Sequence, residues 1–208
     1  MIYIVIACVG SAVVLINAIF AKVPTYHAAP LFLLPLLWAP FFLRRPLRLR
    51  PLEYGLFVVA VIVHDLGAYG YYQQSPLPFS YDIAVHFYFA FAVAFAMHHL
   101  LEESVPVLRP WQVNLTTLLF MMGMGALHEI MEYMSYLMLG EAKGMLKPST
   151  SYFFDTQRDL TNNLLGTLLA LTIINAYRLA TRRESATGRG FDVVEDSEDE
   201  SAAAGQHA

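Results

Sequence analysis

The chain is 208 residues long, 57% of its residues are hydrophobic, and only 14% are charged. Water-soluble domains contain roughly one half apolar and about one quarter charged residues, so this composition excludes an ordinary soluble domain and indicates an integral membrane protein. The sequence has no basic stripe with interleaved aromatic residues, which argues against a nucleic-acid-binding protein. The single cysteine, Cys8, excludes an intramolecular disulfide framework and a cysteine-rich metal site.

Six apolar segments follow one another along the chain, separated by polar residues or by Pro and Gly. They run approximately over residues 2–20, 28–43, 54–72, 83–101, 115–139 and 160–179. A helix needs about 20 residues to cross roughly 30 Å of hydrocarbon, and most of the six segments meet this length. The second segment is short and contains Pro30, Pro35 and Pro40, so we expect it to be kinked, tilted or re-entrant. The sequence predicts an all-α, polytopic transmembrane bundle of five or six spans over residues 1–183.

The two ends of the chain differ in character. The first segment resembles a signal peptide in its hydrophobicity but has no basic start and no convincing small-residue cleavage site, so we expect a retained helix. Residues 184–208 are acidic and rich in Gly, Ala and Ser. Such a segment cannot bury a core, and we expect it to be a disordered tail. The formal net charge of −4 reflects this tail.

The positions of lysine and arginine predict the orientation of the protein. With six spans, nine of the 13 basic residues fall on the side that holds the 43–53 loop, the 102–110 loop and the C-terminus. Loops on the cytoplasmic side carry the excess of Lys and Arg. We therefore expect a multi-pass protein of the inner or plasma membrane with both termini in the cytoplasm.

Ionisable and amide side chains recur within the predicted spans. Each ionisable group costs several kcal/mol in hydrocarbon unless it is paired, neutralised or hydrated, so it invites a functional interpretation. The third span holds a histidine, the fourth begins with an Asp–His pair one turn apart, the fifth carries a His-Glu-x-x-Glu run, and the sixth begins with two aspartates followed by an asparagine. These residues are His64, Asp82, His86, His128, Glu129, Glu132, Asp155, Asp159 and Asn163.

The predicted topology brings these residues to one depth in the membrane. The fourth and sixth helices begin on the non-cytoplasmic side, so their polar residues lie in the first outer turns. The fifth helix runs outward and places its His-Glu run in its outer half. We expect the residues to converge in the outer-leaflet half of the bundle, and this convergence is the main sequence argument for a functional site.

Three kinds of chemistry fit this set of residues. Imidazoles and carboxylates without thiolates suit a divalent cofactor such as Zn, Mn or Fe, or Mg where carboxylates dominate. The candidate metal ligands are His64, His86, His128, Glu129, Glu132 and Asp159. Alternatively, the same groups act as general acids, bases or proton relays. In a third interpretation they join helices through hydrogen bonds, typically worth a kcal/mol or less each.

Two further groups of residues have interfacial positions. Tyr81 and the aromatic residues before it flank an uncharged loop, which is typical of an aromatic belt or of the rim of a ligand site. His98 and His99 stand beside Glu102 and Glu103 at the predicted cytoplasmic end of the fourth helix. We expect these two histidines to be interfacial.

Four motifs in this order resemble a known family. They are His64-Asp-Leu-Gly67, Tyr81-Asp82-x-x-x-His86, His128-Glu129-x-x-Glu132 and Phe154-Asp155-Thr-Gln157-x-Asp159. The set resembles the YjdF-like family of small inner-membrane proteins, and Asp159-x-x-x-Asn163-x-x-Gly166 resembles the closing motif of the wider VanZ-like group. Phe154 replaces a tryptophan of that pattern, and Ile83 replaces an arginine. VanZ-like proteins are linked to altered responses to glycopeptide antibiotics, so the resemblance implies a cell-envelope role but names no reaction.

Together these observations lead to one functional expectation. We expect a polar, metal-binding site that faces the outer leaflet and acts on a lipid or a lipid-linked ligand. If the site is catalytic, His128 or Glu132 serves as general base or ligand, and Asp159 acts beside them. The expected ligand-binding residues are Asp82, Asp155, Asn163 and Tyr81.

Two alternatives remain open. One is a small proton-coupled transporter, which requires a polar path into the cytoplasmic half of the bundle. The other is a non-catalytic subunit or assembly factor of a membrane complex, which requires membrane-protein partners.

Overall fold

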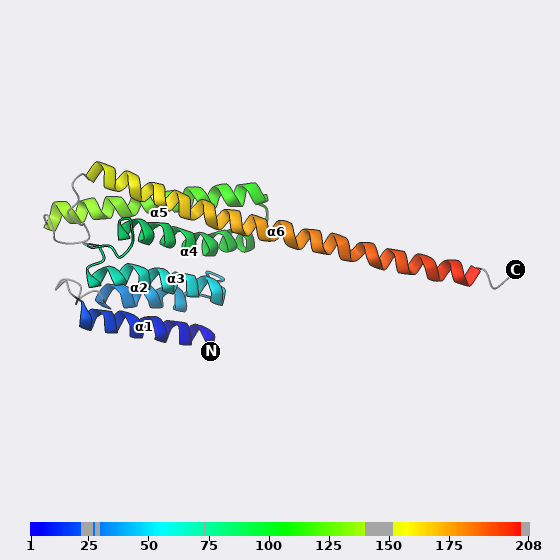
Figure 1. The fold of residues 1–208 in the computed structure, drawn as a ribbon, viewed down its shortest axis with the longest axis horizontal. Coiled ribbons are helices and arrows are strands. Elements are labelled where there is room, and N and C mark those ends of the chain that lie inside the picture. The colour runs from blue at the N-terminus through cyan, green and yellow to red at the C-terminus, as the bar shows by residue number, and fades with distance from the viewer. Residues whose placement is uncertain (22–26, 28–29, 73, 140–151, 205–208) are drawn as a thin grey trace. The chain divides into compact units, whose positions relative to one another are not determined.

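The computed structural model describes residues 1–21, 27, 30–72, 74–139 and 152–204, and no strand occurs among them. The elements in chain order are α1 (Ile2–Phe20), α2 (Pro30–Phe42), α3 (Pro51–Asp65), the 3-10 helix η2 (Leu66–Tyr69), α4 (Tyr81–Ser104), α5 (Pro110–Leu139) and α6 (Tyr152–Ala204) (Figure 1). The predicted all-α class is confirmed.

Among the residues that the structure describes, four helical stretches are long and apolar enough to cross a membrane. They are Ile2–Phe20, Tyr81–Ser104, Pro110–Met134 and Phe154–Thr181. The helix Pro30–Phe42 is apolar but shorter, and it contains Pro35 and Pro40. The second predicted segment therefore contains a short helix, and the kink, tilt or re-entrant path expected from its prolines stays a prediction. Many large apolar side chains of these helices are exposed in the isolated chain, which is the surface that lipid covers in a membrane protein.

The third predicted segment divides into two elements. Its start is well defined, because Pro51 occupies the first turn and the Glu53 carboxylate accepts a 2.8 Å hydrogen bond from the Arg50 N–H. We predicted one helix to residue 72, but α3 ends at Asp65 and tightens into η2. Gly70 then turns the chain with a φ of 91°, a left-handed conformation that favours glycine.

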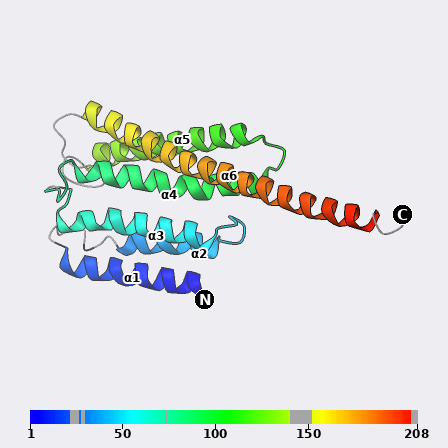
Figure 2. The ribbon, with the colours of Figure 1, turned by 45° about the vertical axis from the view of Figure 1, so that its right-hand side comes forward.

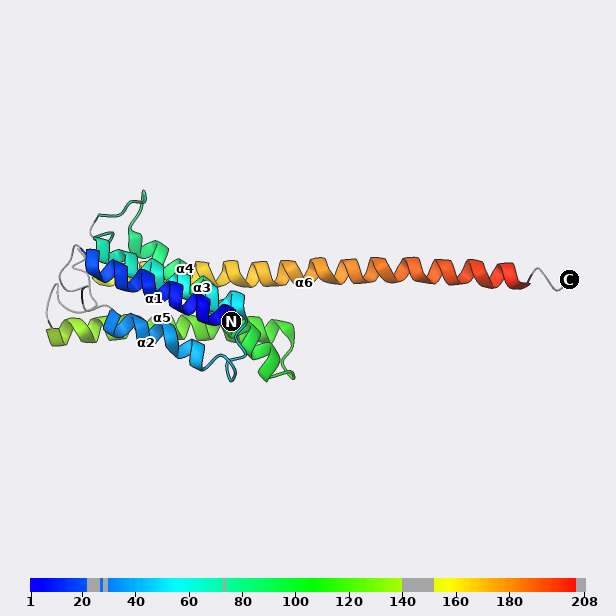
Figure 3. The ribbon, with the colours of Figure 1, turned by 90° about the horizontal axis from the view of Figure 1, so that it is seen from below.

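Residues 1–171 form one compact unit. Within it, α3 contacts α1, α2 and α4, while α4 also contacts α5. The helix axes run roughly parallel or antiparallel to one another in the views of Figures 2 and 3. Such packing brings the start of α4 and the start of α6 to the same end of this unit (Figure 1).

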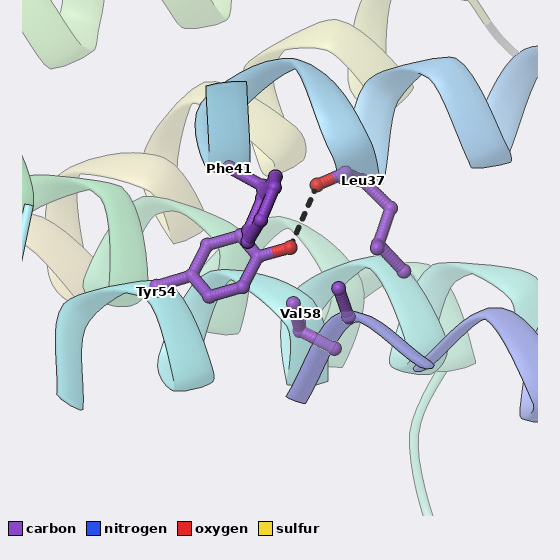
Figure 4. Packing of buried hydrophobic residues seen from close by; sticks show 5 residues of the cluster. Leu37, Phe41, Tyr54 and Val58 are labelled. Atoms are coloured by element: carbon purple, nitrogen blue, oxygen red, sulfur yellow. Dashed lines mark hydrogen bonds between the residues drawn. The ribbon is translucent and has the colours of Figure 1, made fainter. Parts of the chain in front are cut away.

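A buried tyrosine joins α2 to α3. Tyr54 is fully buried against Phe41 and Val58, and its hydroxyl donates a 3.1 Å hydrogen bond to the Leu37 carbonyl oxygen (Figure 4). Helix α1 closes on the same cluster at Gly10, where an added Cβ would lie only 2.6 Å from Val58. Helices α1, α2 and α3 are thus held together by close apolar packing around Tyr54, whose buried hydroxyl has a hydrogen-bond partner.

Residues 172–208 form a second unit. The sequence predicted disorder from residue 184, whereas the structure continues α6 to Ala204. Nucleation is the costly step of helix formation, and a helix that already exists extends at little cost through Ala, Glu and Arg. The expected disorder of this tail stays a prediction.

Candidate metal centre

Helices α4 and α6 bring two aspartates and a histidine together. The side chains of Asp82, His86 and Asp159 each offer a ligand atom, and these atoms all lie within 4.8 Å of one another. Nε2 of His86 is 3.6 Å from Oδ1 of Asp82 and 3.8 Å from Oδ2 of Asp159. His86 and Asp159 are buried, with Asp159 only 1% exposed. Two carboxylates and an imidazole in this geometry are suited to hold a divalent metal.

The backbone places these three groups. Asp82 and His86 lie one turn apart on α4, so they share a face of the helix. Helix α6 approaches α4 directly, because a Cβ added at Gly166 would lie 2.1 Å from the carbonyl oxygen of Phe87. Only glycine allows this approach, and it sets the position of Asp159 relative to the α4 pair.

Arg158 completes the ring of charges around the centre. Its Nη2 lies 3.0 Å from Oδ2 of Asp82 and also contacts Oδ1 of Asp155, while its Nε lies 3.3 Å from Oδ1 of Asp159. The sequence analysis used Arg158 only to predict orientation and missed this role. Part of the signal was available, because Asp155 and Arg158 are opposite charges at the i,i+3 spacing that brings side chains of one helix together.

Helix α5 contributes polar residues beside the centre. The ring of His128 lies 5.5 Å from that of His86, and its Nε2 is 3.3 Å from Oε1 of Glu132. The Glu129 side chain hydrogen-bonds with Thr156, while its buried Oε1 has no hydrogen-bond partner. These three α5 residues border the Asp82–His86–Asp159 group.

Asn163 lies one turn beyond Asp159 on α6. It is 5% exposed, and its side chain hydrogen-bonds to His86. A Cβ added at Gly125 of α5 would lie 2.6 Å from the Asn163 Nδ2. Asn163 is therefore packed tightly between its own helix and α5, where it orients the His86 ring.

His64 and Tyr81 lie at the border of the centre near α3. Nδ1 of His64 is 2.7 Å from the Tyr72 hydroxyl, and His64 interacts electrostatically with His86 and His128. Tyr81 donates its hydroxyl to the Val63 carbonyl oxygen at 2.7 Å, so it joins α4 to α3. The structure thus gathers all the predicted site residues around the start of α4, while their individual roles stay predictions.

Comparison with known proteins agrees with a membrane location. The chain matches the family described as predicted membrane protein (DUF2238) over residues 1–180. The chain belongs to this family. No curated protein and no solved structure matches the chain. The family match includes every residue of the candidate centre.

The structure of this DUF2238 protein shows a second group of polar residues at the other end of α4. His98 and His99 are 1% and 8% exposed, and their expected position at the membrane interface stays a prediction. Both are buried because α3 and α5 cover that end of α4 with polar partners. We call His98, His99, Glu53 and Asn114 the second polar cluster.

Each histidine of the second polar cluster faces oxygen atoms with both ring nitrogens. Nδ1 of His99 is 2.9 Å from Glu53, and its Nε2 is 2.9 Å from Glu103. Nε2 of His98 is 3.0 Å from the Asn114 Oδ1, and its Nδ1 is 3.4 Å from Glu102. A neutral imidazole has one N–H donor and one acceptor nitrogen, so the two carboxylates beside His99 make it a polar junction between α3 and the end of α4. The sequence missed this cluster because its members come from three helices.

Proposed function

We propose that this DUF2238 protein is a metal-dependent membrane protein that acts on a lipid or a lipid-linked ligand. The observation that supports this proposal best is the group formed by Asp82, His86 and Asp159, whose ligand atoms lie within 4.8 Å of one another. Buried carboxylates are costly without a counter-charge. A divalent cation would supply that charge and satisfy the three ligand atoms together.

The donor set limits the choice of metal. Two carboxylates and one imidazole suit Mn, Fe or Zn, and Mg remains suitable because oxygen ligands dominate. The one cysteine, Cys8, is exposed on α1. A soft, thiolate-bound metal therefore finds no support in this donor set.

The surroundings of the centre support a ligand that enters from the membrane. His128 is 35% exposed and Glu132 is 18% exposed, so the α5 border is more open than the buried aspartate and histidine. Exposed apolar residues on the same helix include Leu127 and Met131. An amphipathic molecule can place its polar part at the centre and its chain against this apolar surface.

Catalysis is the further step of this proposal. A metal lowers the pKa of bound water and polarises ester or phosphoryl oxygens, which makes hydrolysis or group transfer the reaction class that fits. In that scheme, His128 or Glu132 accepts a proton from the nucleophile, and Asn163 holds the His86 ring. The YjdF-like and VanZ-like resemblance and the proposed orientation, with both termini cytoplasmic and the centre in the outer leaflet, are consistent with a cell-envelope substrate.

The test of the proposed function is elemental analysis of the full chain purified in detergent. We expect about one divalent metal per wild-type chain and its loss in both His86→Gln and Asp159→Asn. Thr161→Ala is the control, because Thr161 is exposed on α6 one turn from Gln157. Folded wild-type protein that takes up no metal, even when metal is supplied, would refute the proposal.

A second function, a proton-coupled carrier, is favoured by the second polar cluster. Such a carrier needs titratable groups in both halves of the bundle, and His98 and His99 supply buried ones at the far end of α4. However, an apolar cluster that includes Ala90, Ala94 and Met121 lies between the two ends of α4. Proton uptake by reconstituted vesicles that disappears in His99→Gln would favour the carrier over the metal-dependent protein.

A further inference from the structure

The four carboxylate oxygens of Asp82 and Asp159 are divided between two partners. In each aspartate, one oxygen is directed at His86 and the other at Arg158. Oδ1 of Asp82 and Oδ2 of Asp159 are the atoms near the His86 ring. The opposite atoms, Oδ2 of Asp82 and Oδ1 of Asp159, contact the Arg158 guanidinium.

This division means that a cation and Arg158 do not compete for the same atoms. A metal ion held by the oxygens near His86 leaves the contacts of Arg158 intact. The planar guanidinium presents Nε and Nη2 in a fixed geometry, so it fixes the orientation of both carboxylates at once. Outer contacts of this kind are known to orient metal ligands and to tune metal affinity.

Charge gives Arg158 a second role. Three aspartates contact its guanidinium, namely Asp82, Asp155 and Asp159. The guanidinium is a permanent positive charge next to the oxygens that would hold the cation. Its repulsion of a bound cation grows with the charge of that cation, so it disfavours a trivalent ion more than a divalent one.

We propose that Arg158 is the residue that sets the preference of this centre for a divalent cation. It orients the two aspartate ligands, and its positive charge disfavours ions of higher charge. Asp155 contacts Arg158 but is not part of the three-residue ligand group. Its carboxylate adds a negative charge next to Arg158 and so favours a bound cation. This inference rests on the proposed metal centre and adds the determinant of its selectivity.

A purely structural salt bridge would predict something different. If Arg158 only joins α6 to α4, its replacement lowers the stability of the fold and weakens the binding of every cation by a similar factor. If it sets the charge, the ratio of the affinities for a trivalent and a divalent ion changes. The direction of that change depends on the sign of the charge removed.

The experiment measures the affinities of the full detergent-purified chain for Tb³⁺ and Mn²⁺. Arg158→Met removes a positive charge, and we expect the Tb³⁺-to-Mn²⁺ affinity ratio to rise by roughly tenfold or more, from Coulomb energies at an effective dielectric of about 20. Asp155→Asn removes a negative charge, and the ratio should fall. Arg158→Lys keeps the charge but loses the planar contact, so both affinities should weaken while the ratio stays close to that of wild type.

The matched control is Arg109→Met, because Arg109 is an exposed arginine at the start of α5. Thermal melting in metal-free buffer establishes that each variant is folded, and Arg158→Lys and Asp155→Asn keep the test valid if Arg158→Met unfolds. Wild-type protein that binds Mn²⁺ with an unchanged ratio in the charge variants would overturn this inference alone. Wild-type protein that binds neither ion would overturn the proposed metal centre as well.

Discussion

Asp82 and Asp159 lie on different helices, yet each directs one carboxylate oxygen toward His86 and the other toward Arg158. This shared orientation requires α4 and α6 to keep a fixed separation and a fixed rotation about their axes. The backbone of α6 is in close contact with α4 at Gly166, so the geometry of the centre depends on helix packing as well as on its polar residues.

Gly166→Ala should destabilise the protein and weaken metal binding together. The new Cβ would lie 2.1 Å from the Phe87 carbonyl oxygen, so α6 must move away from α4. Overpacking of this kind typically costs 1–3 kcal/mol, and the same movement separates Asp159 from His86. Thermal melting and Mn²⁺ titration of the purified variant measure the two effects.

Gly123→Ala is the control for this prediction. Nothing lies within 4 Å of a Cβ added at Gly123 of α5, so this change should leave both the melting temperature and the Mn²⁺ affinity close to wild type. A Gly166→Ala variant with wild-type melting and affinity would show that α4 and α6 are not in the described contact.

Gly125→Ala should affect the metal centre more than the stability of the fold. The added Cβ would meet the Asn163 Nδ2 at 2.6 Å, and a side-chain amide can move where a backbone carbonyl cannot. We expect Asn163 to rotate away from His86, with a Mn²⁺ affinity about 10-fold lower, the effect typical of losing an outer contact to a metal ligand. If the affinity is unchanged in a folded variant, Asn163 does not position His86.

Tyr54→Phe should lower the free energy of unfolding by about 1–3 kcal/mol. The change removes the hydroxyl that donates to the Leu37 carbonyl oxygen and leaves a buried acceptor without its donor. Metal binding should not change, because Tyr54 packs against α2 and not against the centre. Denaturant unfolding in detergent and Mn²⁺ titration check the two statements separately, and a loss of Mn²⁺ binding would contradict the second.

Removal of residues 184–208 should leave the Mn²⁺ affinity and the main thermal transition unchanged. Every residue of the candidate centre lies within the unit formed by residues 1–171, and the acidic tail has the composition of a segment without a core of its own. The truncated and full chains can be compared by titration and by melting. A weaker affinity in the truncated chain would assign the tail a role in the centre.

The sequence was sufficient to predict most of the helices, because each one is a long apolar segment that is separated from the next by polar residues or by Pro and Gly. The first apolar segment was predicted at the bounds that the structure gives for α1, and the second, over residues 28–43, contains α2. The break after Asp65 was missed because η2 is apolar like the helix before it. Hydropathy alone does not distinguish a helix that continues from one that tightens into a 3-10 turn.

The candidate centre was partly predictable. Asp82 and His86 are one turn apart on one helix, so their pairing follows from helical periodicity. Their position beside Asp159 depends on tertiary packing. The predicted topology indicated only that these residues lie at a similar depth in the membrane, not that they are neighbours. The orientation of Arg158 and the burial of His98 were not predictable, because both depend on which neighbouring helix covers them.

The shortness of α2 has a consequence for the surrounding lipid. Its 13 residues extend about 20 Å at 1.5 Å per residue, which is roughly 10 Å less than the thickness of the hydrocarbon layer. If α2 crosses the bilayer, lipid chains beside it must shorten or disorder, at a cost that grows with each ångström of mismatch. Thinner bilayers would then reduce that cost, and acyl-chain length would become a variable that sorts this protein among membranes and sets its stability within them.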